Sequence, residues 1–203
     1  VILGEISPDS GTVEIGQTVR IAYFRQENEE LNNEERVIDS IKDIADYLPT
    51  TEGLISAAQM AERFLFTPEM QFAPIGKLSG GEKRRLYLLR ILMSAPNVLF
   101  LDEPSNDLDL SSLIVLEDFL DSFPGIVFVI SHDRYFLDRT VNRLFIFQEN
   151  GQIRQFEGGY TDYQVQLLKE KEEAERLLSE KWERWEYLSD LAERIETGEK
   201  RLD

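Results

Sequence analysis

Three short apolar runs most constrain how this chain can fold. Val98 to Leu101, Ile126 to Ile130 and Leu144 to Phe147 are continuously apolar and rich in Val, Ile and Phe. Strands that are buried on both faces of a parallel sheet have this composition. Segments 81–94 and 111–122 have helical patterns that can cover those faces. The alternation predicts an α/β fold with a partly parallel sheet.

The composition excludes several classes of protein. At 203 residues, with 42% hydrophobic and 30% charged residues, the chain is typical of a soluble globular protein with one sizeable core and an appendage. It has neither a membrane-length apolar stretch nor a signal sequence, so we expect a cytoplasmic protein. The absence of cysteine excludes disulfides and cysteine metal sites. A net charge of -17 opposes simple electrostatic binding of nucleic acid.

The first third of the chain reads as short strands followed by helices. Val1 to Leu3 before Gly4 have the pattern of a helix's last turn. Two short strands are predicted at Thr12 to Ile15 and Val19 to Phe24. Residues from Asn28 to about Lys77 are acidic and then helical, which predicts an inserted helical subdomain.

Asp102 and Glu103 directly follow the first of the buried runs. Ligands of parallel sheets bind outside the carboxyl ends of the strands, where His132 also falls. Successive residues at a strand end point in different directions, so one carboxylate can hold a magnesium shell while its neighbour polarises water. The alternative is an acidic pair that only begins a surface loop.

The run Leu78-Ser79-Gly80-Gly81-Glu82 also has two interpretations. Ser79 and Glu82 have the spacing of a capping box. Capping does not require two glycines, which cost stability inside a first turn. Glycines do allow a phosphate to approach backbone donors at a positive helix end. Both roles can hold at once.

Two single residues are weaker candidates. His132 is the only histidine, in Ser131-His132-Asp133 after a buried run. Its near-neutral pKa would let it donate to a phosphate oxygen or hold a water, although a lone histidine is more often structural. Gln26 ends the run that leads into the helical insertion, and it is a candidate metal or water ligand.

The order and spacing of these elements resemble the ABC ATPase domain over about residues 1–163. The matching elements are Gln26, then LSGGE at 78–82, VLFLDE at 98–103, SNDLD at 105–109 and SHD at 131–133. Three segments of the chain are similar to the ABC-F group, which carries two ATPase domains on one chain and no membrane domain. These segments are LDEPSNDLD, SHDRYFLD and EGGYTDY. FLFTPE and the lack of an arm insertion are most similar to the second ATPase domain of a Uup-type protein.

The resemblance implies ATP and Mg²⁺ as cofactors and a role for each matching residue. It implies Asp102 and Gln26 at the magnesium shell, Glu103 as general base and His132 as the switch histidine near the γ-phosphate. ATP would lie between two domains arranged head to tail. The residues implied to bind it from the opposite domain or at the interface are Ser79, Gly80, Gly81, Glu82 and Asp109.

One family element is missing from the sequence. The phosphate-binding motif G-x-x-x-x-G-K-[ST] occurs nowhere in the 203 residues, because Gly76-Lys77 has no glycine at position 71 and is followed by Leu78 in place of a hydroxyl residue. We therefore expect a fragment that begins inside the helix after this motif. We expect the chain alone to bind ATP weakly and not to hydrolyse it. A natural pseudo-ATPase is the alternative.

The segment 164–203 is predicted as an amphipathic helix or coiled coil. It carries 12 acidic residues against 8 basic ones. The resemblance implies a coiled coil that binds nucleic acid or the ribosome, whereas the acidic charge favours packing on its own domain or on a partner. The apolar seam consists of Leu167, Ala174, Leu178, Trp185, Leu188, Ala192, Ile195 and Leu202.

Two function classes follow from these observations. The first is a soluble ATPase that acts on ribosomes or nucleic acid, with no direct insertion into a membrane. The second is the ATPase subunit of a membrane transporter, with the helical insertion docked on a membrane partner. We expect a partial ATPase domain at 1–163, with a helical subdomain at 27–97, and a separate C-terminal helix.

Overall fold

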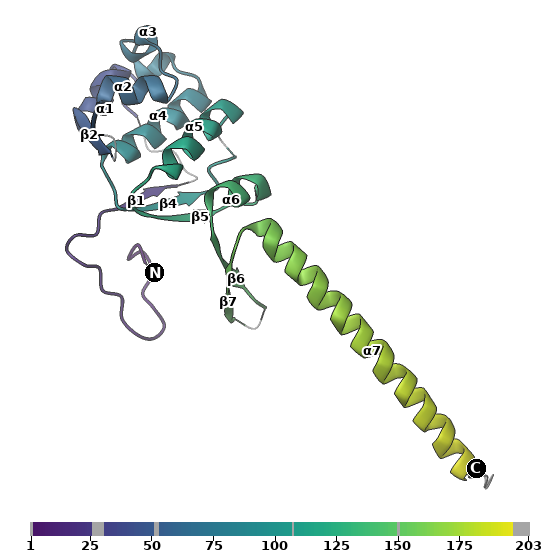
Figure 1. Ribbon diagram of the computed structural model, residues 1–203. Helices are drawn as coiled ribbons and strands as arrows, with labels where there is room; N and C mark the ends of the chain where they lie inside the picture. The colour runs from purple at the N-terminus through teal and green to yellow at the C-terminus, as the bar shows by residue number, and fades with distance from the viewer. Residues whose placement is uncertain (1, 26–30, 51–52, 107, 150, 197–203) are drawn as a thin grey trace. The chain divides into compact units, whose positions relative to one another are not determined.

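A computed structural model describes residues 2–25, 31–50, 53–106, 108–149 and 151–196. The chain forms two compact units, residues 1–141 and 142–203. Each is described by itself below, with the elements labelled as in Figure 1.

A three-stranded parallel sheet lies at the centre of the first unit. Its strands are β1 (Ile21–Phe24), β4 (Val98–Asp102) and β5 (Ile126–Ile130), in the order β1-β4-β5. The register pairs Phe24 with Leu101 and Asp102 with Ile130. The parallel sheet predicted from the apolar runs is confirmed for β4 and β5.

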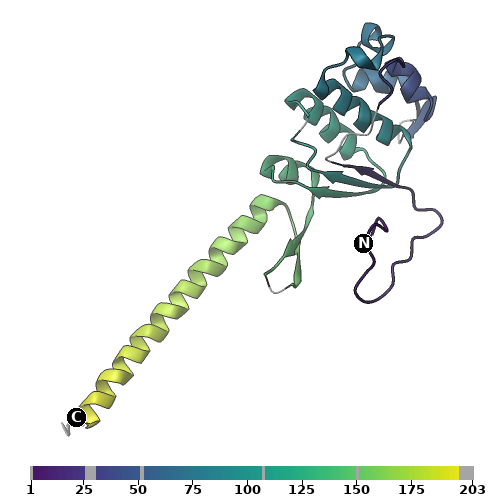
Figure 2. The same ribbon diagram turned by 180° about the vertical axis from the view of Figure 1, so that it is seen from behind.

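Two long helices cover one face of this sheet, as Figures 1 and 2 show. They are α4 (Gly80–Met93) and α5 (Leu110–Asp121), close to the predicted segments. Leu99 and Leu101 of β4 point into the core beneath them and are almost fully buried. The apolar core that holds sheet and helices together includes Phe24, Leu86, Leu88, Leu89, Leu92 and Leu116.

The predicted helical subdomain is present, with one unpredicted element. Its helices are α1 (Val37–Lys42), α2 (Ala57–Arg63), α3 (Pro68–Gln71) and a short 3-10 turn at Ile75–Lys77. Between α1 and α2, β2 (Tyr47–Thr50) and β3 (Gly53–Ser56) form an antiparallel hairpin. A run of only four residues in each strand gives too little alternation to be read from the sequence.

The predictions for the first residues of the chain are partly wrong. Residues 2–6 form turns and bends, not the end of a helix, and Thr12 to Ile15 form no strand. Ile6 and Ile15 are 68% and 53% exposed, so neither packs into a core that would fix regular structure. The second predicted strand begins at Ile21 instead of Val19.

The prediction that residues 144–147 form a strand of the parallel sheet is also wrong. These residues belong to β6 (Arg143–Phe147), which pairs antiparallel with β7 (Ile153–Glu157) in a hairpin of the second unit. Leu144 and Ile146 are half-buried, whereas Phe145 and Phe147 are 51% and 79% exposed. The continuous apolar run conceals a strand that is covered on one face only.

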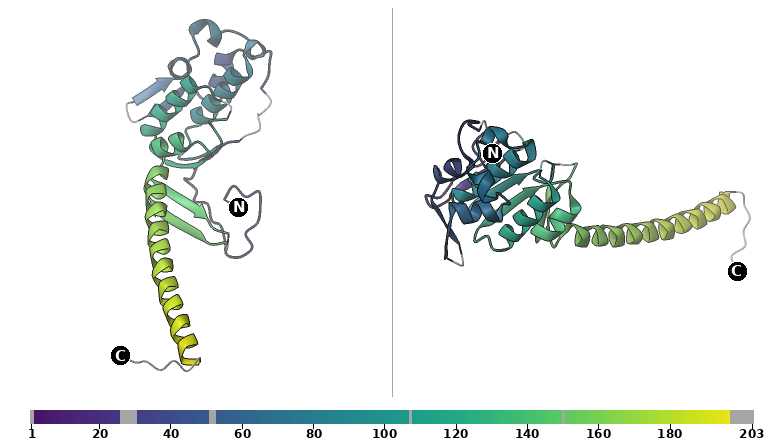
Figure 3. Two further views of the ribbon diagram at one scale, coloured as in Figure 1. Left: turned by 90° about the vertical axis from the view of Figure 1, so that its right-hand side faces the viewer. Right: turned by 90° about the horizontal axis from the view of Figure 1, so that it is seen from above.

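A 37-residue helix, α7 (Tyr160–Glu196), follows the hairpin. Figure 3 shows it as one continuous helix that starts beside β6 and β7. The Gly159 amide donates to Asp162 Oδ2 at 3.2 Å, and the Phe156 and Tyr163 rings lie 5.5 Å apart. These contacts, with Gly158 at a φ of 136°, fix the joint formed by the EGGYTDY sequence.

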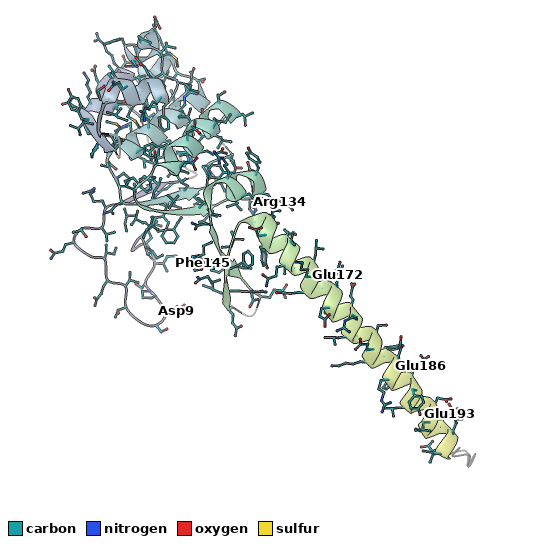
Figure 4. All side chains as sticks on the ribbon, viewed as in Figure 1. Asp9, Arg134, Phe145, Glu172, Glu186 and Glu193 are labelled. Carbon is teal, nitrogen blue, oxygen red and sulfur yellow. The ribbon has the colours of Figure 1, made fainter. Side chains whose placement is uncertain are left out.

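The side chains of α7 extend into solvent, as Glu172, Glu186 and Glu193 do in Figure 4. None of its residues is buried, and Leu178 and Trp185 in the predicted seam are 65% and 59% exposed. The predicted C-terminal helix is confirmed, while a coiled coil stays a prediction. Among the described residues, no helix combines the length and the apolar character needed to cross a membrane.

One charged pair ties α7 to the hairpin, and its titration can be predicted. Arg154 donates to both carboxylate oxygens of Glu170, at 3.2 and 2.7 Å, and lowers the pKa of Glu170 from 4.5 to about 2. We expect NMR of the labelled chain to show this low midpoint. The stabilisation of the joint is present above pH 4.5 and is lost as the pH falls towards 2. Arg154→Gln should raise the midpoint, whereas that of Glu173, which pairs with Arg176, should not move.

Candidate active site

The parallel register brings two polar segments to one edge of the sheet. β4 ends at Asp102 opposite Ile130, the last residue of β5. The Glu103 amide donates to the Ile130 carbonyl at 2.8 Å, which extends the pairing one residue beyond the strand. The segment that carries His132 therefore begins directly beside the segment that carries Glu103.

Glu103 and His132 are in contact at this edge, the carboxyl ends of the strands where the sequence analysis located both residues. The His132 amide donates to Glu103 Oε2 at 3.3 Å, and His132 Nε2 lies 3.4 Å from Glu103 Oε1. The Glu103 side chain is 12% exposed and the His132 side chain is 98% exposed. The mostly buried carboxylate is thus held by the His132 amide, while the imidazole faces solvent, where it can meet a ligand.

The backbone of Glu103 is strained. Its φ of 46° places a non-glycine residue in the left-handed region, at a cost on the order of 1 kcal/mol. Two hydrogen bonds hold it there, one from the Glu103 amide to the Ile130 carbonyl and one from the His132 amide to the Glu103 carboxylate. Such strain is concentrated at functional sites. The left-handed backbone turns the Glu103 side chain away from the direction that an extended strand would give it.

A second link joins the two loops at this edge. Ser105 Oγ lies 3.3 Å from Ser131 Oγ, and Ser131 Oγ also accepts the Asp133 amide at 3.0 Å. Asp133 in turn caps helix α6 (Arg134–Thr140) by accepting the Phe136 amide. The loops after β4 and β5 are therefore tied together at more than one point.

Asp102 is held by a residue that sequence reasoning missed. The Tyr23 hydroxyl donates to Asp102 Oδ2 at 2.8 Å. This hydrogen bond, together with burial, raises the pKa of Tyr23 above its ordinary value. A tyrosine 79 positions before the aspartate gives no sequence signal, because the contact depends on the pairing of β1 with β4.

The Asp102 carboxylate fits a magnesium ion that arrives with phosphates. The described residues contain no group of three or more histidine, cysteine or acidic side chains that could enclose a metal. Mg²⁺ does not need one, because it is usually held by one or two carboxylates, water and substrate phosphates. Gln26, the other predicted metal ligand, lies outside the described residues.

Ser79 to Glu82 form the predicted capping box at the start of α4. The Glu82 amide donates to Ser79 Oγ at 3.3 Å, and the Ser79 amide donates to Glu82 Oε2 at 2.7 Å. Hydrogen bonds from the Ser79 amide and hydroxyl lower the pKa of Glu82. A Cβ atom added to Gly80 or Gly81 would meet nothing within 4 Å. Packing among the residues that the structure describes therefore does not require either glycine.

Asp109 has a local role as the cap of α5. It accepts the Ser112 amide at 2.8 Å and the Ser112 hydroxyl, and these bonds lower the pKa of Asp109. Arg85 Nη1 lies 3.7 Å from its other oxygen. The Asp109 side chain is still 67% exposed, so capping leaves it accessible at the surface. Its predicted interface role stays a prediction.

The profile of the ABC transporter family matches residues 1–106. The chain belongs to this family. The pattern that resembled the ABC ATPase domain is thereby confirmed. The predicted α/β fold with flanking helices and a C-terminal helix is confirmed by the structure itself. The arrangement described above belongs to an ABC ATPase domain, in which α4 is followed by β4, which ends at Asp102, and Glu103 comes directly after this strand.

Several bacterial proteins are similar to the chain in sequence. YfmR of Bacillus subtilis, described as an uncharacterized ABC transporter ATP-binding protein, is 58% identical over 163 residues, which is 80% of this chain and 26% of YfmR. Uup of Escherichia coli K12, an ATP-binding protein, is 38% identical over 80% of this chain and 26% of its own length. The energy-dependent translational throttle protein EttA of the same strain is 38% identical over 81% of this chain and 30% of its own length.

Solved structures share the fold. An archaeal ribosome recycling factor, aABCE1, in complex with a ribosomal stalk protein, has a TM-score of 0.61 at 20% identity, over 82% of this chain and 32% of that one. An RNase-L inhibitor has a TM-score of 0.57 at 19% identity, over 80% of this chain and 32% of the inhibitor chain. The chain spans about a quarter to a third of the length of the relatives and structures named here.

Two substitutions separate capping from ligand approach at the signature. Ser79→Ala removes the side-chain acceptor of the capping box and should lower the free energy of unfolding by about 1 kcal/mol. Gly81→Ala should not lower it and should raise it by up to roughly 1 kcal/mol, because the added methyl group meets open space and alanine favours a helix. Urea unfolding of both variants measures this. A strongly destabilised Gly81→Ala would show that the glycine serves the fold.

Proposed function

We propose that the chain is part of the ATP-hydrolysing machinery of an ABC-F protein that acts on the ribosome. Asp102 contributes to the shell of Mg²⁺, Glu103 is the general base for the attacking water, and His132 contacts the terminal phosphate. Bound Mg²⁺ would supply charge neutralisation at the phosphates. Gln26 is a predicted further ligand of the metal or its water.

The contact between Glu103 and His132 is the observation that carries this proposal. A general base must lie within hydrogen-bond reach of the water that it activates, and a phosphate contact must lie next to that water. The carboxylate and the imidazole lie 3.4 Å apart at a strand edge, and the imidazole is almost fully exposed. A nucleotide phosphate that meets His132 from solvent would therefore come close to the Glu103 carboxylate.

The signature residues Ser79, Gly80, Gly81 and Glu82 bind the nucleotide of a second ABC domain in this proposal. The open space at both glycines supports it, because a ligand from outside can reach backbone donors at the positive end of α4. Asp109 lies at the same interface, with its carboxylate exposed. The two domains would then be arranged head to tail, each completing the other's site.

The ribosome is the proposed target because EttA, a relative at 38% identity, is named as a translational throttle protein. The net charge of -17 and the acidic α7 oppose a simple electrostatic contact with DNA or RNA, so a contact with the ribosome would be made by a local patch. A cytoplasmic location is part of the same proposal. The transporter subunit is the second candidate, because the family that matches the chain is described as ABC transporter.

We expect no measurable ATP turnover from the 203-residue chain. No G-x-x-x-x-G-K-[ST] segment is present to hold the β- and γ-phosphates, so Glu103 would have no positioned substrate. A phosphate-release assay of the chain and of Glu103→Gln should give the same background rate. Turnover that disappears in Glu103→Gln would contradict this expectation.

Sedimentation distinguishes the proposed targets. We expect a larger fraction of the chain to pellet with purified ribosomes than with duplex DNA or with lipid vesicles, all at physiological salt. Measuring the pelleted fraction again at higher salt shows whether a local basic patch carries the contact. Equal pelleting with all three, or pelleting with DNA alone, would contradict the ribosome as target.

A further inference from the structure

Tyr23 has a place in the sheet that lets it reach Asp102. It pairs with Phe100 across the β1–β4 ladder, and Asp102 lies two residues further along β4 on the same face. Two residues of a strand rise about 6.6 Å, which is roughly the reach of a tyrosine side chain that leans along the strand. The hydroxyl consequently meets Asp102 Oδ2 at 2.8 Å.

The Tyr23 ring is held from two sides. The edge-to-face contact with Phe100 has a centroid separation of 6.3 Å, and Phe100 itself stacks on Phe128 at 4.7 Å. The guanidinium of Arg25 lies 5.1 Å from the centre of the Tyr23 ring. A ring fixed in this way presents its hydroxyl in one direction, so its hydrogen bond is formed before any ligand binds.

We propose that Tyr23 is a positioning residue for the magnesium site. This inference rests on the proposed function, in which Asp102 contributes to the metal shell. By occupying Oδ2, the Tyr23 hydroxyl fixes the carboxylate plane and directs Oδ1 towards the ion. Partners that orient a metal-binding carboxylate in this way commonly account for ten- to a hundred-fold in metal affinity.

The test follows Mn²⁺, a paramagnetic substitute for Mg²⁺, with the isotope-labelled 203-residue chain. Bound Mn²⁺ broadens nearby amide resonances, so the signals of Glu103 and His132 report the site. Tyr23→Phe removes only the hydroxyl and should raise the Mn²⁺ concentration for half-broadening roughly ten-fold or more. Tyr47→Phe is the matched control, because Tyr47 is 59% exposed on β2 and should have no effect.

Asp102→Asn completes a double-mutant cycle. It should weaken Mn²⁺ binding by itself, and Tyr23→Phe should cause no further loss in its presence. If Asp102→Asn weakens binding and Tyr23→Phe does not, the positioning role is wrong while the proposed metal site stands. If Asp102→Asn has no effect on the broadening, both the metal site and the role of Tyr23 are wrong.

A second measurement avoids dependence on the folding of Tyr23→Phe. The ring-carbon resonance next to the Tyr23 hydroxyl, recorded at pH 7, should shift between the wild-type chain and Asp102→Asn. The corresponding Tyr47 resonance should not shift. An unchanged Tyr23 resonance would show that the hydrogen bond is not formed in solution and would overturn the inference.

Discussion

The parallel register between β4 and β5 is the constraint on which the candidate active site depends. Because Asp102 pairs with Ile130, the Glu103 amide reaches the Ile130 carbonyl, and the Glu103 carboxylate lies beneath the backbone of His132. Shifting the register by one residue would move every side chain of the strand to the other face of the sheet. It would also remove Leu99 and Leu101 from the core. The same apolar burial that stabilises the sheet therefore sets the distance between the two polar residues.

The core also stabilises features that are unfavourable in isolation. The left-handed backbone at Glu103 costs free energy locally, and the helices packed on β4 offset this cost by burying the strand that precedes it. Arg84 of α4 is a further example, since its guanidinium is almost fully buried. It stacks 3.9 Å from the centre of the Phe24 ring and donates to the Arg25 carbonyl. The signature helix is thereby tied to the end of β1, next to the predicted ligand Gln26.

The sequence was most informative where apolar pattern and motif coincide. The runs at 98–101 and 126–130 were correctly predicted as strands of a parallel sheet, but Ile126 and Ile130 are 58% and 59% exposed, so β5 is not buried on both faces. The run at 144–147 looked the same, yet Phe145 and Phe147 are exposed in a hairpin. An apolar residue does not reveal which face is covered. The Tyr23–Asp102 bond was out of reach for another reason, because it depends on how two strands 79 residues apart are aligned.

The two halves of the candidate site are fixed in different ways. Asp102, Glu103 and His132 are held by hydrogen bonds between segments that are distant in sequence, so their arrangement needs the whole sheet. Ser79 and Glu82 bond to each other within a single helical turn, beside glycines at which an added Cβ would meet nothing within 4 Å among the described residues. A capped helix end keeps its geometry without a ligand, so it can present its donors to whatever approaches from outside. This difference is what the proposed site, shared between two domains, would require, because each half would have to be formed before the other arrives.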